Sequence, residues 1–137
     1  MKFNELGYYT SRHASFLIQY HLVLVTRLRH PVLTGELEET LINYTKEYFE
    51  KQDCPIIEIN TNQDHIHILF EASPTTNLAT FINAYKSASS RRMRTDFEEF
   101  LKPYYWKPYF WSMSYFIASV SERTLTAVKS YIQNQKD

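Results

Sequence analysis

The run at residues 63–70 constrains the fold more than any other segment, because polar and apolar residues alternate along it. His65 and His67 alternate with Ile66 and Ile68. Successive side chains of an extended strand point to opposite faces of a sheet, so the two histidines share one face and the apolar residues share the other. We therefore predict a strand that packs a core on one side and presents His65 and His67 on the other.

The other segments predict an α+β fold. Residues 16–26 alternate in the manner of a central strand covered on both faces, and apolar stripes at helical spacing follow Thr34 and Asn77, which are predicted N-caps. The expected order is β-α-β-β-α-β-α, a ferredoxin-like or RNA-recognition-like antiparallel sheet with helices on one face plus a C-terminal helix. Strands are expected at 16–26, 55–60, 65–73 and 111–120, and the last helix at about 121–135.

Composition is consistent with one compact domain over residues 1–137. The 137 residues are 44% hydrophobic and include only two glycines, with no linker-like tract. No apolar run reaches the ~18 residues that a membrane span requires, and no signal peptide is recognisable, so we expect a cytoplasmic protein without membrane association. The single cysteine, Cys54, is expected to be a buried apolar residue.

Charge is balanced overall but unevenly distributed. The chain has 15 basic and 15 acidic residues. Acids predominate in residues 35–58, whereas basic residues predominate in 1–34 and in 85–110, which includes Arg91 and Arg92. Such a polarised surface can bind nucleic acid by one face, although a solvated helix end explains the arginines equally well.

Tyr131 and Gln135 are four residues apart in the predicted last helix and would stand on the same side of it. Together with His65 and His67 they could form a metal-assisted tyrosine nucleophile. Each residue also has a simpler interpretation, as a half-exposed strand histidine, a core-edge tyrosine or a solvent-facing glutamine. A zinc site with Cys54 lacks a recognisable fourth ligand.

Five separated motifs occur in the order found in single-tyrosine HUH transposases of small insertion sequences, and nearly the whole chain resembles this family. The resemblance implies that His65 and His67 are metal ligands, that Tyr131 is the nucleophile and that Gln135 is the third ligand. It also implies a homodimer in which the histidines of one subunit meet Tyr131 and Gln135 of the other. The motifs are Tyr20-His21 and the segments 64–69, 86–91, 111–116 and 131–135.

The family's activity would be cleavage and rejoining of single-stranded DNA with stem-loop ends, through a 5′-phosphotyrosine. A divalent ion would orient and polarise the phosphate, and the sequence does not decide between Mg²⁺ and Mn²⁺. No phosphate-binding loop is present, and the stored phosphodiester energy makes a nucleotide cofactor unnecessary. The protein would associate with the nucleoid when it acts.

Contacts with DNA are predicted for basic and aromatic residues. Core or dimer-interface packing is the alternative role of the aromatic residues. The candidates are Lys86, Arg91, Arg92, Tyr104, Tyr105 and Trp106.

Two departures and two alternative functions accompany the resemblance. Ser121 follows the last strand where many members have glycine, and a net charge of zero implies few phosphate contacts. A non-catalytic single-stranded nucleic-acid-binding module would leave Tyr131 and Gln135 unexplained. A domesticated relative that nicks chromosomal repeat hairpins would share the chemistry without mobility.

Overall fold

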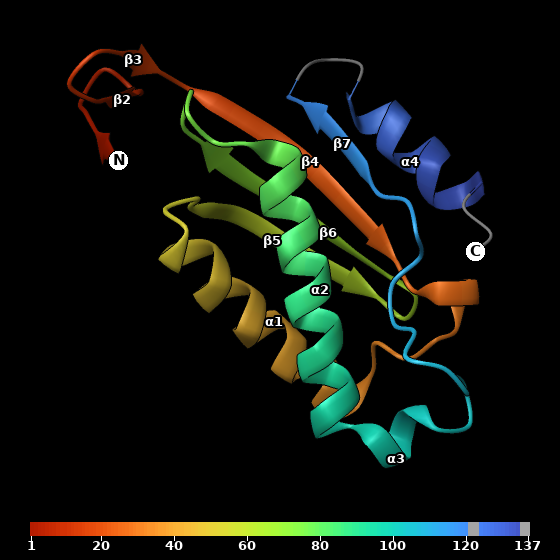
Figure 1. Cartoon of the computed structure of the whole chain (residues 1–137). Coiled ribbons are helices and arrows are strands. Elements are labelled where there is room, and N and C mark those ends of the chain that lie inside the picture. The colour runs from red at the N-terminus through yellow and green to blue at the C-terminus, as the bar shows by residue number, and fades with distance from the viewer. Residues whose placement is uncertain (121–123, 135–137) are drawn as a thin grey trace.

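A four-stranded antiparallel sheet forms the centre of the protein, which we describe from a computed structural model covering residues 1–120 and 124–134 (Figure 1). The order of its strands is β5-β6-β4-β7, so β4 and β6 are central and β5 and β7 are the edges. The predicted α+β class and antiparallel sheet are confirmed. The sheet strands are β4 (Ile18–Val25), β5 (Ile56–Asn62), β6 (His65–Ala72) and β7 (Phe116–Ser119).

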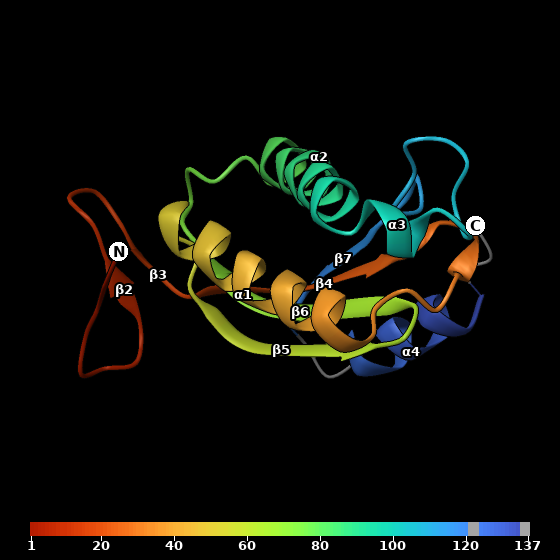
Figure 2. The same ribbon diagram turned by 90° about the horizontal axis from the view of Figure 1, so that it is seen from below.

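Helices lie on both faces of the sheet (Figure 2). The helices α1 and α2 cover one face, and α4 lies against the other, where its Val128 packs on Val23 and Val25 of β4. Strand β4 is therefore covered on both faces, as its sequence predicts. The helices are α1 (Gly35–Lys51), α2 (Leu78–Asp96), the short α3 (Glu98–Leu101) and α4 (Thr124–Asn134), and a single 3₁₀ turn, η1, spans Arg27–Arg29.

The predicted boundaries hold for most elements. Asn77 caps α2 through its side chain, which accepts a hydrogen bond from the Thr80 amide at 3.1 Å. Thr34 is the N-cap of α1, but its side chain makes no capping hydrogen bond. The predicted start of the last helix at 121 and its end at 135 lie outside the described residues.

The last sheet strand is shorter than the predicted segment 111–120. Trp111 makes only an isolated bridge with Thr26, and the regular strand begins at Phe116. The Lys86 ammonium donates hydrogen bonds to the carbonyls of Ser112 (2.8 Å) and Met113 (3.0 Å). The carbonyls of Ser112 and Met113 are thus bound by a side chain of α2 instead of a neighbouring strand.

The N-terminal segment forms a separate small sheet that the sequence did not predict. It contains β1 (Lys2–Phe3), β2 (Tyr9–Thr10) and β3 (Ser15–Phe16), paired antiparallel in that order. Figure 2 shows it projecting from one end of the molecule. Tyr9 anchors it, because the buried Tyr9 ring packs between Phe3 and Phe16 and its hydroxyl donates to Glu71 of β6.

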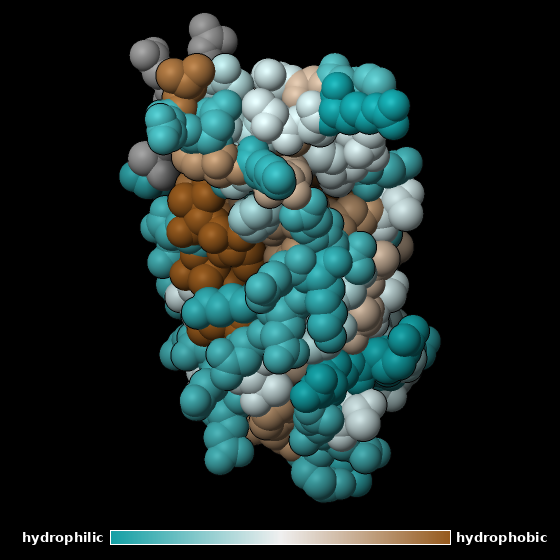
Figure 3. Space-filling model, turned by 90° about the vertical axis from the view of Figure 1, so that its left-hand side faces the viewer, coloured by the Kyte–Doolittle hydropathy of each residue, from teal (hydrophilic) through white to brown (hydrophobic). Residues whose placement is uncertain are grey.

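The outer edge of β5 is partly apolar. A β-bulge between Ile56 and Glu58 leaves Ile57 48% exposed, beside a hollow of about 560 Å³. An apolar patch is visible on this side of the molecule (Figure 3). Cys54 borders the hollow but is buried, as predicted.

Across the described ranges, no helix combines the length and apolar character needed to cross a bilayer.

Candidate active site

His65 and His67 lie on β6 on the sheet face that α4 covers. They pair across the sheet with Val25 and Val23 of β4, whose side chains pack on Val128. Ile66 and Ile68, between and after the histidines, are fully buried on the opposite face. The alternation in the sequence thus predicts the orientation of both histidines correctly.

His65 is held by its neighbour Asp64. The Nδ1 of His65 lies 2.9 Å from Asp64 Oδ1, and because a carboxylate can only accept, Nδ1 carries the proton. Nε2 is then the nitrogen with a lone pair for a metal ion. Burial alone would raise the pKa of Asp64, but hydrogen bonds from His65 and Arg29 outweigh it and lower that pKa. Asp64 is therefore ionised at neutral pH.

His67 has a partner that the sequence did not single out as a site residue. His21 Nδ1 lies 2.6 Å from His67 Nε2, and the rings stack at 4.9 Å with 14° between their planes. Burial lowers the pKa of His67, and the adjacent His21 lowers it further; burial also lowers the pKa of His21. Both imidazoles are thus neutral at pH 7, the state in which imidazole binds metals. The signal that would have found His21 is the β4–β6 register, which no single sequence reveals.

Tyr131 lies on the same sheet face as the histidines but over a different strand. Its ring packs on Phe116 of β7 with a centroid distance of 5.3 Å, and its hydroxyl is 3.1 Å from Ser114 Oγ. Because β4 separates β7 from β6, the strand carrying Phe116 and the histidine strand are two strand spacings apart, about 10 Å. The fold brings Tyr131 and the two histidines to one face, with Tyr131 toward the β7 side of it.

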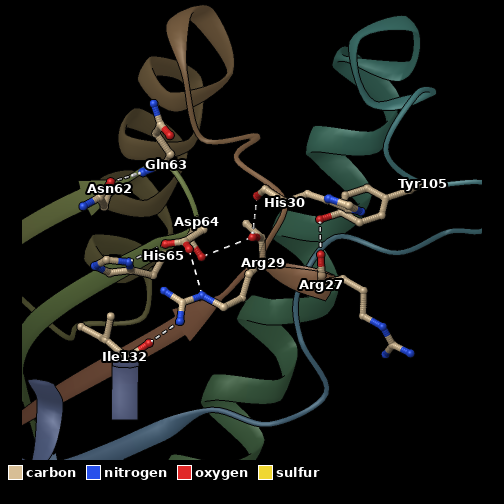
Figure 4. A network of polar contacts seen from close by, with 10 residues as sticks. Arg27, Arg29, His30, Asn62, Gln63, Asp64, His65, Tyr105 and Ile132 are labelled. Atoms are coloured by element: carbon tan, nitrogen blue, oxygen red, sulfur yellow. Dashed lines mark hydrogen bonds and ion pairs between the residues drawn. The ribbon is translucent and has the colours of Figure 1, made fainter. Parts of the chain in front are cut away.

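Arg29 connects α4, the helix of Tyr131, to the histidine strand (Figure 4). Its Nε donates to Asp64 Oδ2 at 2.9 Å, and its Nη1 donates to the carbonyl of Ile132 at 2.7 Å. Arg29 has a positive φ of 54°. The turn η1 thereby directs its side chain between Asp64, beside His65, and Ile132, beside Tyr131.

The donor set fits a divalent ion in part. His65 offers Nε2, whereas His67 Nε2 is hydrogen-bonded to His21. This hydrogen bond must break before His67 Nε2 can coordinate a metal ion. Gln135, the third predicted ligand, lies outside the described residues. Within residues 1–120 and 124–134, no three His, Cys, Asp or Glu side chains are grouped so as to hold a metal ion. An ion bound by the two histidines therefore needs at least one further ligand.

The predicted DNA contacts differ in accessibility. Arg91 and Arg92 are exposed on α2, whereas the Lys86 ammonium is bound to two carbonyls. Tyr105 is only 8% exposed, and its hydroxyl donates to the Arg27 carbonyl. Half-buried Tyr104 packs on the core, in contrast to Trp106, which is 79% exposed. Of the three aromatic candidates, Trp106 thus presents most of its ring surface to solvent.

The fold and this histidine and tyrosine constellation define a small transposase of the single-tyrosine class. The family described as "Transposase IS200 like" matches residues 14–135, and the chain belongs to that family. Membership implies a DNA-cleaving activity. The family assignment predicted from the sequence motifs is confirmed.

Individual relatives agree with this assignment. The chain is 33% identical over 122 residues to the ISDra2 transposase TnpA of Deinococcus radiodurans, covering 89% of this chain and 86% of that one. It is 27% identical over 123 residues to the transposase for insertion sequence element IS200 of Salmonella typhimurium, covering 90% and 80%. A crystal structure described as a putative transposase from Deinococcus radiodurans R1 superposes with a TM-score of 0.85 at 30% identity, covering 93% and 97%.

Proposed function

We propose that the protein cleaves and rejoins single-stranded DNA at the ends of an insertion sequence, through a 5′-phosphotyrosine on Tyr131. The observation that carries this proposal is that His65, His67 and the helix of Tyr131 occupy one face of the sheet. A non-catalytic binding module has no need of this arrangement. The whole of residues 1–137 would act as one transposase domain.

The reaction exchanges one phosphodiester for another. The Tyr131 oxygen attacks the phosphorus, a bond to phosphorus forms, and the bond to the 3′ oxygen of the DNA breaks. The phenol proton is lost and the departing 3′ oxygen gains a proton, so the step balances without a nucleotide cofactor. Attack of a 3′-hydroxyl on the phosphotyrosine reverses these events and rejoins DNA.

The residues of the chain prepare this step. His65, His67 and Gln135 would hold a divalent ion, Mg²⁺ or Mn²⁺. When bound, such an ion neutralises charge on the phosphate and orients it for in-line attack. Asp64 fixes the His65 tautomer, and burial keeps His67 neutral. The phenol has an ordinary pKa of about 10, so Tyr131 needs an activated phosphate.

The position of Tyr131 supports the proposed homodimer. Tyr131 contacts Ser114 and Phe116 toward β7, and β7 lies two strand spacings, about 10 Å, from the histidine strand. A second copy could supply Tyr131 and Gln135 to His65 and His67 without large changes in the sheet. Such an assembly would hold two sites and two DNA ends.

The DNA would bind as an unpaired strand with stem-loop ends. The side chains proposed to contact it are cations on α2, of which Arg91 and Arg92 are exposed, and aromatic residues of the following loop. Trp106 has the most exposed ring of the aromatic group. The proposed contacts are Lys86, Arg91, Arg92, Tyr104, Tyr105 and Trp106.

A covalent-adduct assay tests the proposed chemistry. The protein is mixed with labelled single-stranded stem-loop DNA from the flanks of its gene, with Mg²⁺, Mn²⁺ or EDTA, and the products are separated on denaturing gels. We expect a metal-dependent protein–DNA adduct that Tyr131→Phe abolishes. Tyr44→Phe is the matched control, because Tyr44 is also a half-buried helix tyrosine but lies on the opposite sheet face. An adduct that survives in Tyr131→Phe would exclude Tyr131 as the nucleophile.

A further inference from the structure

A groove lined by basic and aromatic side chains lies on the loop that follows α3. It consists of two adjoining hollows of about 320 and 360 Å³, which share Pro108 and Tyr109. We name it the Tyr109 groove. It is built onto the end of β4, because the Arg27 amide donates to the Phe110 carbonyl at 2.9 Å and Tyr105 donates to the Arg27 carbonyl at 2.8 Å.

The charge of this groove is strongly positive in a chain whose formal net charge is zero. One acidic side chain, Glu98, lines it. Such a surplus of cations attracts a polyanion to this surface, although the net charge of the whole chain does not favour one. The basic lining residues are Arg27, Lys86, Arg94, Lys102 and Lys107.

Arg27 has one guanidinium nitrogen without an acceptor among the described residues. Its guanidinium lies 4.4 Å from the centre of the Tyr109 ring, and its Nε is buried without a hydrogen-bond partner in the described part of the chain. A buried donor that loses water without gaining an acceptor destabilises the protein, more so when it is charged. A phosphate beside this guanidinium would supply charge-assisted hydrogen-bond acceptors.

Trp106 presents an aromatic surface at the same groove. Its side chain is 79% exposed, its ring meets Tyr109 edge-to-face at 6.4 Å, and Lys107 Nζ lies 4.6 Å from its centre. Exposed indole rings beside cations bind nucleobases by stacking while the cations meet the backbone. Stacking on a single ring requires a base with a free face, which favours an unpaired nucleotide over a duplex.

The groove is close to the histidine site along the chain and in space. Val25 of β4 pairs with His65, and Arg27 follows Val25 by two residues. In Figure 4 the side chains of Arg27 and His65 extend to opposite sides of Arg29. A DNA strand bound at the histidines would reach the groove by passing round the end of β4.

We propose that the Tyr109 groove binds an unpaired nucleotide of single-stranded DNA, with its phosphate on Arg27 and its base on Trp106. The inference rests on the proposed function only for the identity of the strand, which would be the one cleaved at His65 and His67. The binding itself needs neither metal nor Tyr131. It can therefore be tested apart from catalysis.

The test uses the full chain carrying Tyr131→Phe, which prevents cleavage, and a fluorescein-labelled oligothymidylate. Fluorescence anisotropy gives the affinity, and quenching of tryptophan emission reports stacking. We expect Trp106→Ala to weaken binding by about 5- to 150-fold and Trp106→Phe to abolish the quenching, since Trp111, the other tryptophan, is buried. Arg27→Gln should lower the slope of log affinity against log salt by about 0.7.

Lys51→Gln is the matched control for Arg27→Gln. It removes one charge from an exposed lysine at the end of α1, outside the groove, and should bind the oligothymidylate like the parent. Parental affinity in Trp106→Ala and Arg27→Gln would overturn the proposal. So would binding of an aspartate-rich peptide without binding of oligothymidylate. If Trp106-dependent binding is found but no DNA flank gives an adduct with Tyr131 intact, the groove stands and the proposed chemistry fails.

Discussion

His21 Nδ1 lies 2.6 Å from His67 Nε2, so one nitrogen of the predicted ligand pair is already hydrogen-bonded. His65 differs, because its Nδ1 faces Asp64 and its Nε2 remains for an ion. The two histidines of the His-x-His motif are thus not equivalent. A metal ion that binds His67 Nε2 must either displace His21 or use His21 as a further ligand.

Replacing His21 with leucine separates these two roles. If His21 only competes for His67, its removal eliminates a hydrogen bond of about 1 kcal/mol, and the affinity for Mn²⁺ should rise about fivefold. Titration calorimetry with Mn²⁺ measures this. Gln19→Leu is a suitable control, because Gln19 lies on the same face of β4 but bonds to Glu71 instead. Weaker Mn²⁺ binding in His21→Leu would show that His21 is itself a ligand.

The same pair predicts how stability depends on pH. Burial lowers the pKa of His67 and of His21 in the folded protein, so the unfolded chain binds protons more readily than the folded one. Their contribution to the free energy of unfolding is therefore present in full above the unfolded pKa of about 6.5 and lost as pH falls below it. Urea unfolding between about pH 7 and pH 5 measures the slope.

His67→Asn should flatten this slope, because it removes one of the two groups. His13→Asn should leave it unchanged, because His13 is exposed in the N-terminal segment. Equal slopes in His67→Asn and the parent would contradict the assignment of the pH dependence to the pair.

The alternation at residues 63–70 predicted the strand and the sheet face on which both histidines lie, because each depends on one segment alone. The partners of those histidines depend on register between strands distant in sequence. His21 meets His67, and Arg29 meets Asp64 and Ile132, only because β4 lies between β6 and β7. A single sequence does not give that order directly.

The sequence predicts an apolar stripe of Leu37, Leu41, Tyr44 and Tyr48 on α1, which is correct only in part. Leu37 and Leu41 are buried, but the buried row continues through Thr45 and Phe49, while Tyr44 and Tyr48 lie at its edge. Thr45 is buried because its hydroxyl bonds to the Leu41 carbonyl and to the Tyr85 hydroxyl. Apolarity alone could not identify a threonine whose polar group has two partners inside the core.

Arg29→Met tests the connection between α4 and the histidine strand. The variant loses the hydrogen bonds to Asp64 and to the Ile132 carbonyl, and because the site is partly exposed we expect a loss of only about 1–2 kcal/mol in unfolding free energy. Urea denaturation measures the change. Arg12→Met, at an exposed position in the N-terminal segment, is the control. An Arg29→Met variant as stable as Arg12→Met would show that the contact contributes nothing to stability.

Val128→Ala tests whether α4 is a separately removable element. Val128 is a buried side chain by which α4 packs on Val23 and Val25, whereas α1 and α2 pack in the larger core on the opposite face. Loss of two buried methyl groups lowers the stabilisation from apolar burial by roughly 1.5 kcal/mol. If the helix can detach, only the local stability of α4 decreases by this amount. Hydrogen exchange should then accelerate in α4 and remain slow in α1 and α2.

Leu41→Ala in the larger core is the matched truncation. It should lower the stability of the whole sheet and accelerate exchange in α1, α2 and α4 together, since Leu41 is fully buried. If Val128→Ala instead accelerates exchange equally in all these helices, α4 is an integral part of the fold. The tyrosine helix would then stay packed on its own sheet, and a second copy would have to supply Tyr131 to the histidines without its α4 detaching.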